Sequence, residues 1–169
     1  MTVNHANCYT LKLFHMLITP HVLVGLVIIK IFPYPLGAFL LVLLSHFFLD
    51  FFIPHWNPHI YTEMKKNKKI NLSSLVIILI DGLITTLIFT YLSYQALPNF
   101  GKIIIYGLTA FFSILPDLIE VPYYFFGSKN KKLISYVNFA HKYQSDGNVF
   151  WGVITQVLVI LVCIKQLFF

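Results

Sequence analysis

Five apolar stretches divide this chain of 169 residues, near residues 17–32, 36–53, 72–97, 101–126 and 148–168. An α-helix needs about 20 predominantly apolar residues to cross the hydrocarbon core of a bilayer. The pattern therefore predicts an all-α integral membrane protein with about five transmembrane helices.

Cap and breaker residues suggest where these helices begin and end. Thr19 followed by Pro20 is typical of a helix start, with Thr19 as the N-cap and Pro20 at the first helical position. Pro33, Tyr34 and Pro35 predict a tight turn, and Pro54 is expected to end the second helix. Within the fourth stretch, Pro116 is expected to kink or break the helix.

Composition strengthens the membrane assignment. Hydrophobic residues make up 58% of the chain and charged residues 11%, with a mean hydropathy of +0.78. A soluble domain usually carries about 25% charged residues. We expect one transmembrane helical domain, residues 16–169, after an N-terminal arm, residues 1–15. Cys8 lies in the polar arm and Cys163 in the last apolar stretch, so these two cysteines predict neither a disulfide nor a cysteine metal site.

The basic residues are distributed unevenly between the two predicted faces of the membrane. All twelve are lysines; four lie in residues 54–71, four in residues 127–147, and Lys12 is in the arm, which makes nine. With five spans these nine share one side, so the positive-inside rule predicts a cytoplasmic N-terminus in a multi-pass protein of a bacterial inner membrane. The net charge of +6 is thus attributed to orientation, and no nucleic-acid partner is expected.

Ionisable residues gather in the half of the membrane that faces the cytoplasm. His46 and Asp50 are four residues apart, so a helix would present both on one face. Asp117 and Glu120 are three residues apart in the fourth stretch, and Asp81 lies well inside the third. Buried acids and imidazoles need a partner, and a divalent cation is the simplest one. We expect zinc, or alternatively manganese, held by ligands from His21, His46, Asp50, His55 and Asp117.

Three further residues are candidates for catalysis. Asp81 or Glu120 is a candidate general base. His141 and His55 are candidates for protonating a leaving group or, alternatively, for binding a second metal. Each residue also has an ordinary structural interpretation: His21 could bond within the helix packing, and Asp81 could pair with a lysine. His59 and Asp146 are weaker candidates for ligands, and we expect Glu63, His5 and His15 to be solvated or idle.

Three short motifs resemble a known family. They are Thr19, Pro20 and His21; Ser45, His46 and Asp50 followed by Pro54; and Leu115, Pro116 and Asp117. They resemble small bacterial inner-membrane proteins regarded as metal-dependent hydrolases, which include the LexA-regulated membrane hydrolases. The resemblance covers roughly residues 16–145 and implies roles for His21, His46, Asp50 and Asp117. This chain departs from that family at two places. It has Leu118, Ile119 and Glu120 where the family has a second Asp and a His, and its loop around His141 differs from the family's loop motif.

Together these features predict a hydrolase that acts on a lipid or lipid-linked phosphoester or ester at the cytoplasmic leaflet. A divalent metal would activate water at neutral pH, and the lysines in residues 65–69 would attract an anionic headgroup. A proton or divalent-cation transporter and a non-enzymatic scaffold are the alternatives. We expect the imidazoles and carboxylates of the first four helices to share one pocket, with His55 and His141 at its cytoplasmic mouth.

Overall fold

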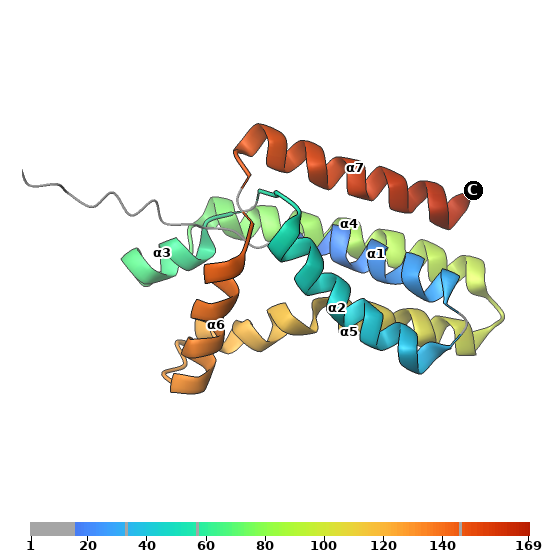
Figure 1. Ribbon diagram of the computed structural model, residues 1–169, viewed down its shortest axis with the longest axis horizontal. Helices are drawn as coiled ribbons and strands as arrows, with labels where there is room; N and C mark the ends of the chain where they lie inside the picture. Colours follow the sequence, from blue (N-terminus) through green and yellow to red (C-terminus); the bar gives the residue numbers. More distant parts are fainter. Residues whose placement is uncertain (1–15, 33, 57, 146) are drawn as a thin grey trace, which may run out of the picture.

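The computed structural model describes residues 16–169 except 33, 57 and 146, and Figure 1 shows its helices. The arm and residue 33 of the predicted turn therefore lie outside the described residues. Within the described part, the secondary structure consists of helices without a regular sheet. The helices are α1 (Ile18–Ile31), α2 (Pro35–Phe52), α3 (Ile60–Asn67), α4 (Leu72–Ala96), α5 (Phe100–Phe126), α6 (Lys131–Tyr143) and α7 (Val149–Phe168).

Four helices of the described chain, α2, α4, α5 and α7, are long and apolar enough to cross a membrane. The prediction of an all-α membrane protein is thus confirmed. The first apolar stretch forms α1, which has only 14 residues. Its length is about 21 Å at 1.5 Å per residue, compared with about 30 Å for the hydrocarbon core. It therefore differs from the other four predicted spans.

Helix α1 tolerates its short length because other helices surround it. It packs against α2, α4, α5 and α7, and its side chains Val22, Leu23 and Leu26 are buried. At Gly25 the neighbouring helix comes especially close, since a Cβ atom there would lie 2.2 Å from Ser113 Oγ of α5. Protein rather than lipid thus lines the first half of α1, so its N-terminal end does not have to reach a membrane surface.

The start of α1 corrects the predicted cap. The helix begins at Ile18, and the residue at its N-cap position, Leu17, makes no capping bond with its side chain. The Asp81 carboxylate of α4 instead accepts hydrogen bonds from Ile18 N at 2.6 Å, from Thr19 N at 3.3 Å and from the Thr19 hydroxyl at 2.5 Å. Thr19 is therefore the second residue of the helix and not its N-cap. A carboxylate from another helix, instead of a capping side chain, satisfies the first amides.

Prolines act differently in α2 and α5. Helix α2 ends at Phe52, so the prediction that it stops at Pro54 is confirmed. Helix α5 continues from Phe100 to Phe126 through both Pro116 and Pro122, so Pro116 does not break it. The chain after Pro116 therefore stays helical, which keeps Asp117 and Glu120 one turn apart.

The short helices α3 and α6 lie at the same end of the bundle, beside the C-terminal end of α2 (Figure 1). Glu63 of α3 is buried there, contrary to the expected solvation. Its carboxylate accepts hydrogen bonds from Asn71 N and Asn71 Nδ2, both at 2.8 Å, and from Ser74 Oγ at 2.7 Å. Glu63 thus anchors the N-terminus of α4 to α3.

Candidate metal centre

The site begins with the predicted pair on α2. His46 and Asp50 are both buried, and His46 Nε2 lies 3.5 Å from Asp50 Oδ2. Their separation of four residues puts them on one helical face, as the sequence indicates. This face is turned toward α1 and α5, because α2 packs against both helices.

Helix α1 adds a second imidazole. His21 Nε2 lies 3.2 Å from Asp50 Oδ1, so each oxygen of this carboxylate faces a different histidine. The rings of His21 and His46 stack with their centroids 4.1 Å apart and an interplanar angle of 22°. The two ring nitrogens therefore approach the same carboxylate from neighbouring helices.

Helix α5 completes the group with Asp117. Its Oδ1 atom lies 3.6 Å from His46 Nε2, and about a quarter of its side chain (24%) is exposed. One ligand atom from each of His21, His46 and Asp117 fits within 4.8 Å of the others. The structure thus brings together four of the five predicted ligands, from three helices, and we call His21, His46, Asp50 and Asp117 the HD cluster.

A backbone contact fixes the proton on His46. Its Nδ1 atom lies 2.7 Å from the carbonyl oxygen of Ser113 on α5. A carbonyl oxygen can only accept, so Nδ1 must carry the hydrogen, and the lone pair of the neutral ring is left on Nε2. Nε2 is the atom that faces Asp50 and Asp117. Metal-binding histidines are commonly oriented by this kind of bond from their other nitrogen.

The donor set of the HD cluster suits a divalent metal. Ligand atoms bound tetrahedrally at 2.0–2.2 Å lie roughly 3–4 Å from one another. Three pairs of donor atoms in the cluster are 3.2, 3.5 and 3.6 Å apart, two of them through different oxygens of Asp50. The ligand atoms of His21, His46 and Asp117 all lie within 4.8 Å of one another. Two imidazoles and two carboxylates are a typical zinc or manganese set, and the two negative charges would balance one dication.

Main-chain groups hold Asp50 in place. Met16 N donates to Asp50 Oδ1 at 3.3 Å, and Ser145 N donates to the Asp50 carbonyl at 2.8 Å. The segment after α6 and the residues before α1 therefore both lie against the C-terminal end of α2. These bonds tie the position of Asp50 to two other parts of the chain.

His55 is buried beside the end of α2. Its Nδ1 lies 2.7 Å from the Ile53 carbonyl oxygen, and its own carbonyl accepts from Gly147 N at 3.2 Å. Burial lowers the pKa of His55 below its ordinary value, although the nearby Asp50 charge and the Ile53 carbonyl act in the opposite direction. Among the described residues, His55 and Asp50 lie outside the group whose ligand atoms are all within 4.8 Å of one another. Asp50 joins the HD cluster through its contacts with His21 and His46, whereas the role of His55 as a ligand stays a prediction.

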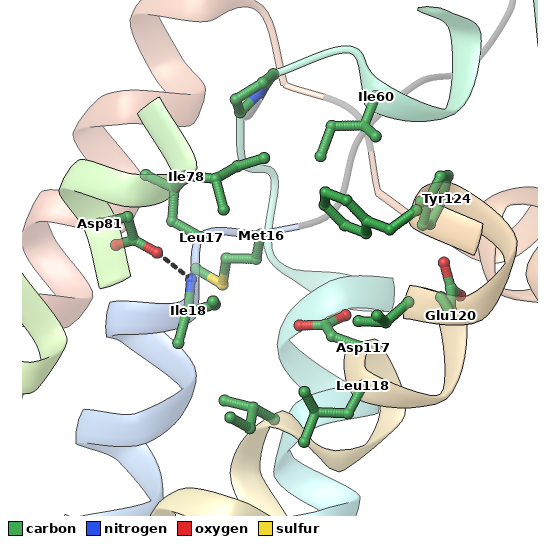
Figure 2. Close-up of a pocket in the computed structure, with 14 residues that line it drawn as sticks. Met16, Leu17, Ile18, Ile60, Ile78, Asp81, Asp117, Leu118, Glu120 and Tyr124 are labelled. Carbon is green, nitrogen blue, oxygen red and sulfur yellow. Dashed lines mark hydrogen bonds between the residues drawn. The ribbon is translucent and has the colours of Figure 1, made fainter. Parts of the chain in front are cut away.

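The carboxylate of Asp81 engages a different part of the molecule. Figure 2 shows it on the far side of a pocket from Asp117, directed at the backbone nitrogen of Ile18. Its contacts are those that hold the start of α1. The structure thus gives Asp81 a structural partner, and its role as a general base stays a prediction.

Glu120 and His141 are joined by a residue that sequence reasoning missed. The Tyr124 hydroxyl lies 2.7 Å from His141 Nε2, and it is also hydrogen-bonded to the Glu120 side chain. The ring of His141 stacks on Tyr61 of α3 at 3.9 Å between centroids. Glu120, Tyr124 and His141 are all buried. The sequence could have indicated Tyr124 as a partner of Glu120, because a separation of four residues places both side chains on one face of α5.

A pocket of about 160 Å³ adjoins the HD cluster (Figure 2). Asp117 belongs to both, and Glu120 and Asp81 also line the pocket. The rest of the lining is mainly apolar: Met16, Leu17, Ile18, Pro58, Ile60, Ile78, Ile114, Leu118, Val121, Tyr124 and Phe125. The buried acids of α4 and α5 therefore border one largely apolar space.

Comparisons of this chain with protein-family models, with curated proteins and with solved structures found no match.

Proposed function

We propose that this protein is a membrane-embedded, metal-dependent hydrolase of the bacterial inner membrane. Its substrate is a lipid or lipid-linked ester or phosphoester at the cytoplasmic leaflet. The observation that carries the proposal is the orientation of His46. Its Nδ1 is committed to the Ser113 carbonyl, so its Nε2 presents a lone pair to the space shared with His21, Asp50 and Asp117.

The HD cluster supplies the metal ligands in this proposal. His21 and His46 contribute Nε2 atoms, and Asp50 and Asp117 contribute carboxylate oxygens. A bound zinc or manganese ion would polarise the substrate and lower the pKa of water to near neutrality. The protein's part is to fix the four donors, which the short contacts between α1, α2 and α5 support.

Hydrolysis also moves protons. Water gives up a proton and adds to the acyl carbon or phosphorus, the bond from that atom to the departing oxygen breaks, and the departing oxygen takes up a proton. Glu120 is one helical turn from Asp117 on α5, so it is placed to accept the proton from a water molecule at the HD cluster. The Tyr124 hydroxyl connects Glu120 to His141, so this hydrogen-bonded chain joins the proposed base to the proposed proton donor for the departing oxygen.

Two features support a lipid as the substrate. The HD cluster lies among helices that are long and apolar enough to cross a membrane, and the adjoining pocket is largely apolar. Helix α3 carries Lys65 and Lys66 and lies at the end of the bundle where α2 ends (Figure 1). With Lys68 and Lys69 these lysines would attract a phosphate headgroup. The resemblance of the three motifs to inner-membrane hydrolases points to the same class of protein.

Metal analysis of the purified protein tests the proposal. The wild type should carry about one zinc or manganese ion per chain, and His46→Ala should lose most of it. His59→Ala is the matched control, because His59 is exposed and lies outside the HD cluster. Cobalt loading adds a spectroscopic measurement, since Co²⁺ in a four-coordinate site absorbs strongly in the visible range. An unchanged metal content in His46→Ala, or a wild type that binds no divalent metal, would overturn the proposal.

A further inference from the structure

Apart from Asp117, the residues that line the apolar pocket beside the HD cluster have no role in holding the metal. We propose that this pocket binds the hydrocarbon chain of a membrane lipid, next to the bond that the proposed hydrolase would cleave. This inference rests on the proposed function for its reaction, but the binding of the chain can be tested separately.

The pocket is built by four parts of the chain. Ile18 comes from the start of α1, Ile60 from α3, Ile78 from α4, and Leu118 and Val121 from α5. A cavity of about 150 Å³ with aliphatic walls can hold one benzene molecule. The pocket, at about 160 Å³, can therefore hold a segment of about six carbons. It selects part of a chain rather than a whole lipid.

The charges around the pocket indicate which part of a lipid enters it. Asp81, Asp117 and Glu120 line its wall, and lysine is absent from the lining. An anionic headgroup inside the pocket would face these carboxylates at low dielectric, which is costly. An uncharged chain avoids that cost, and its headgroup would lie toward the HD cluster, where a bound dication offsets the acids. Asp117 belongs to both spaces and marks the boundary between chain and headgroup.

The pocket wall continues onto the lipid-facing surface of α5. Leu118 is 40% exposed and Phe125 is 51% exposed, and both also line the pocket. A chain can therefore enter sideways from the bilayer without crossing water. This continuity favours a membrane lipid over a water-soluble ligand.

Photolabelling tests the proposal in the full-length protein. The probe is a phosphatidylethanolamine with a diazirine in the middle of one chain, in nanodiscs of phosphatidylcholine. Labelled positions are identified by mass spectrometry of peptides. We expect adducts to concentrate on Ile78, Leu118 and Val121. Adducts spread evenly over outward-facing residues of α4, such as Leu79 and Leu83, would overturn the proposal.

Variants that fill the pocket sharpen the test. Val121→Trp should reduce labelling of Ile78 several-fold, and Ile78→Phe should do the same at Val121 from the opposite wall. Leu79→Trp is the matched control, because Leu79 lies next to Ile78 on α4 but is 62% exposed and outside the pocket lining. Labelling of Ile78 and Val121 should not change in this variant. Where a variant does not fold, the distribution of adducts in the wild type decides the question.

The two proposals fail separately. Metal titration is carried out on the same nanodisc samples, with and without chelator. Pocket labelling without any metal binding would remove the hydrolase proposal and leave a lipid-binding site. Metal binding with evenly spread adducts would leave the metal centre and remove the chain pocket.

Discussion

The proton on His46 connects helix packing to chemistry. The ring could in principle carry its hydrogen on either nitrogen, and the Ser113 carbonyl places it on Nδ1. Ser113 also lies opposite Gly25 of α1, so the spacing of α1 from α5 affects the atom that orients His46. The geometry of one imidazole thus depends on close packing at a residue with no ionisable group.

Glu63 gives a prediction about pH outside the membrane-spanning segments. Burial by itself would raise the pKa of its carboxyl, but hydrogen bonds from Asn71 and Ser74 outweigh burial, and the pKa lies below the ordinary value of 4.5. A depressed pKa in the folded state stabilises the fold above the pKa of the unfolded state. This stabilisation is lost as the pH falls from about 4.5 through the lower folded value.

We therefore expect Glu63→Gln to lower the free energy of unfolding at pH 7 by about 1–3 kcal/mol, since a charged acceptor of three hydrogen bonds is replaced. The difference from the wild type should shrink as the pH falls below 4.5. Thermal unfolding in detergent at several pH values measures it. Ser74→Ala removes one donor without removing the titrating group and serves as the control. A difference that stays constant down to pH 3 would contradict the assignment.

At the scale of elements, α1 and α4 are linked through Asp81. Helix α1 starts beside the tenth residue of α4, roughly 14 Å from the first residue of α4 along its axis. Its first amides are therefore inside the bundle, where water cannot satisfy them and an unsatisfied group is costly. A carboxylate is the strongest acceptor available, and its charge also suits the positive end of the helix dipole.

Asp81→Asn separates this structural role from a catalytic one. The asparagine can still accept one bond but loses the charge, so stability should fall by about 1–2 kcal/mol. Metal content should fall far less than in His46→Ala, because the hydrogen bonds of Asp81 go to Ile18 and Thr19 and not to a proposed ligand. Unfolding in detergent and metal analysis of one sample measure both quantities. Full stability with lost activity on a lipid substrate would instead favour the general-base role.

Gly25 is the second link between elements. Gly25→Ala adds a Cβ that would lie 2.2 Å from Ser113 Oγ and 3.2 Å from Val42 Cγ1, so α1 must move away from α5 and α2. We expect a loss of about 1–3 kcal/mol in stability, as for other overpacked sites. Metal binding should also weaken, because His21 is one turn away on the same face of α1.

Gly37→Ala provides the control for this change. A Cβ at Gly37 meets nothing within 4 Å, and alanine favours the helix by about 0.5–1 kcal/mol. Equal metal affinity in the Gly25→Ala and Gly37→Ala proteins would show that the packing of α1 does not position His21.

The parts of the site that the sequence predicts are those that depend on local spacing. His46 and Asp50 are four residues apart, and helical geometry alone puts them on one face. The partner of Asp81 lies 63 residues away at Ile18, and the partner of Tyr124 lies 17 residues away at His141. Such partners depend on how helices rotate and slide against each other, which hydropathy does not determine. Hydropathy likewise does not show that other helices surround the short α1, so it predicts α1 as an ordinary span.

At the scale of the whole molecule, the lysines separate toward the two ends of the bundle. Eight described lysines belong to α3, α6 and their adjoining segments: Lys65, Lys66, Lys68, Lys69, Lys129, Lys131, Lys132 and Lys142. Lys30, Lys102 and Lys165 lie near the ends of α1, α5 and α7 at the opposite end of the bundle (Figure 1). Lys30 Nζ donates to the carbonyl oxygens of Gln166 and Leu167, at 2.6 and 3.2 Å. Its charge therefore also serves the C-terminus of α7.

This separation predicts the orientation of the protein. The positive-inside rule places the end with eight lysines in the cytoplasm, together with the HD cluster. A reporter fused after Phe169 should then signal from the periplasm, because α7 runs from that end to the opposite one (Figure 1). A reporter inserted at Asn67, between Lys66 and Lys68, should signal from the cytoplasm. The measurement uses two reporters at each position: alkaline phosphatase, which is active only in the periplasm, and green fluorescent protein, which fluoresces only in the cytoplasm.

The reverse result would move the HD cluster to the periplasmic half, and the substrate would then have to be sought in the outer leaflet. Cytoplasmic signals from both positions would mean that α7 does not cross the membrane, although its length and hydropathy allow it to.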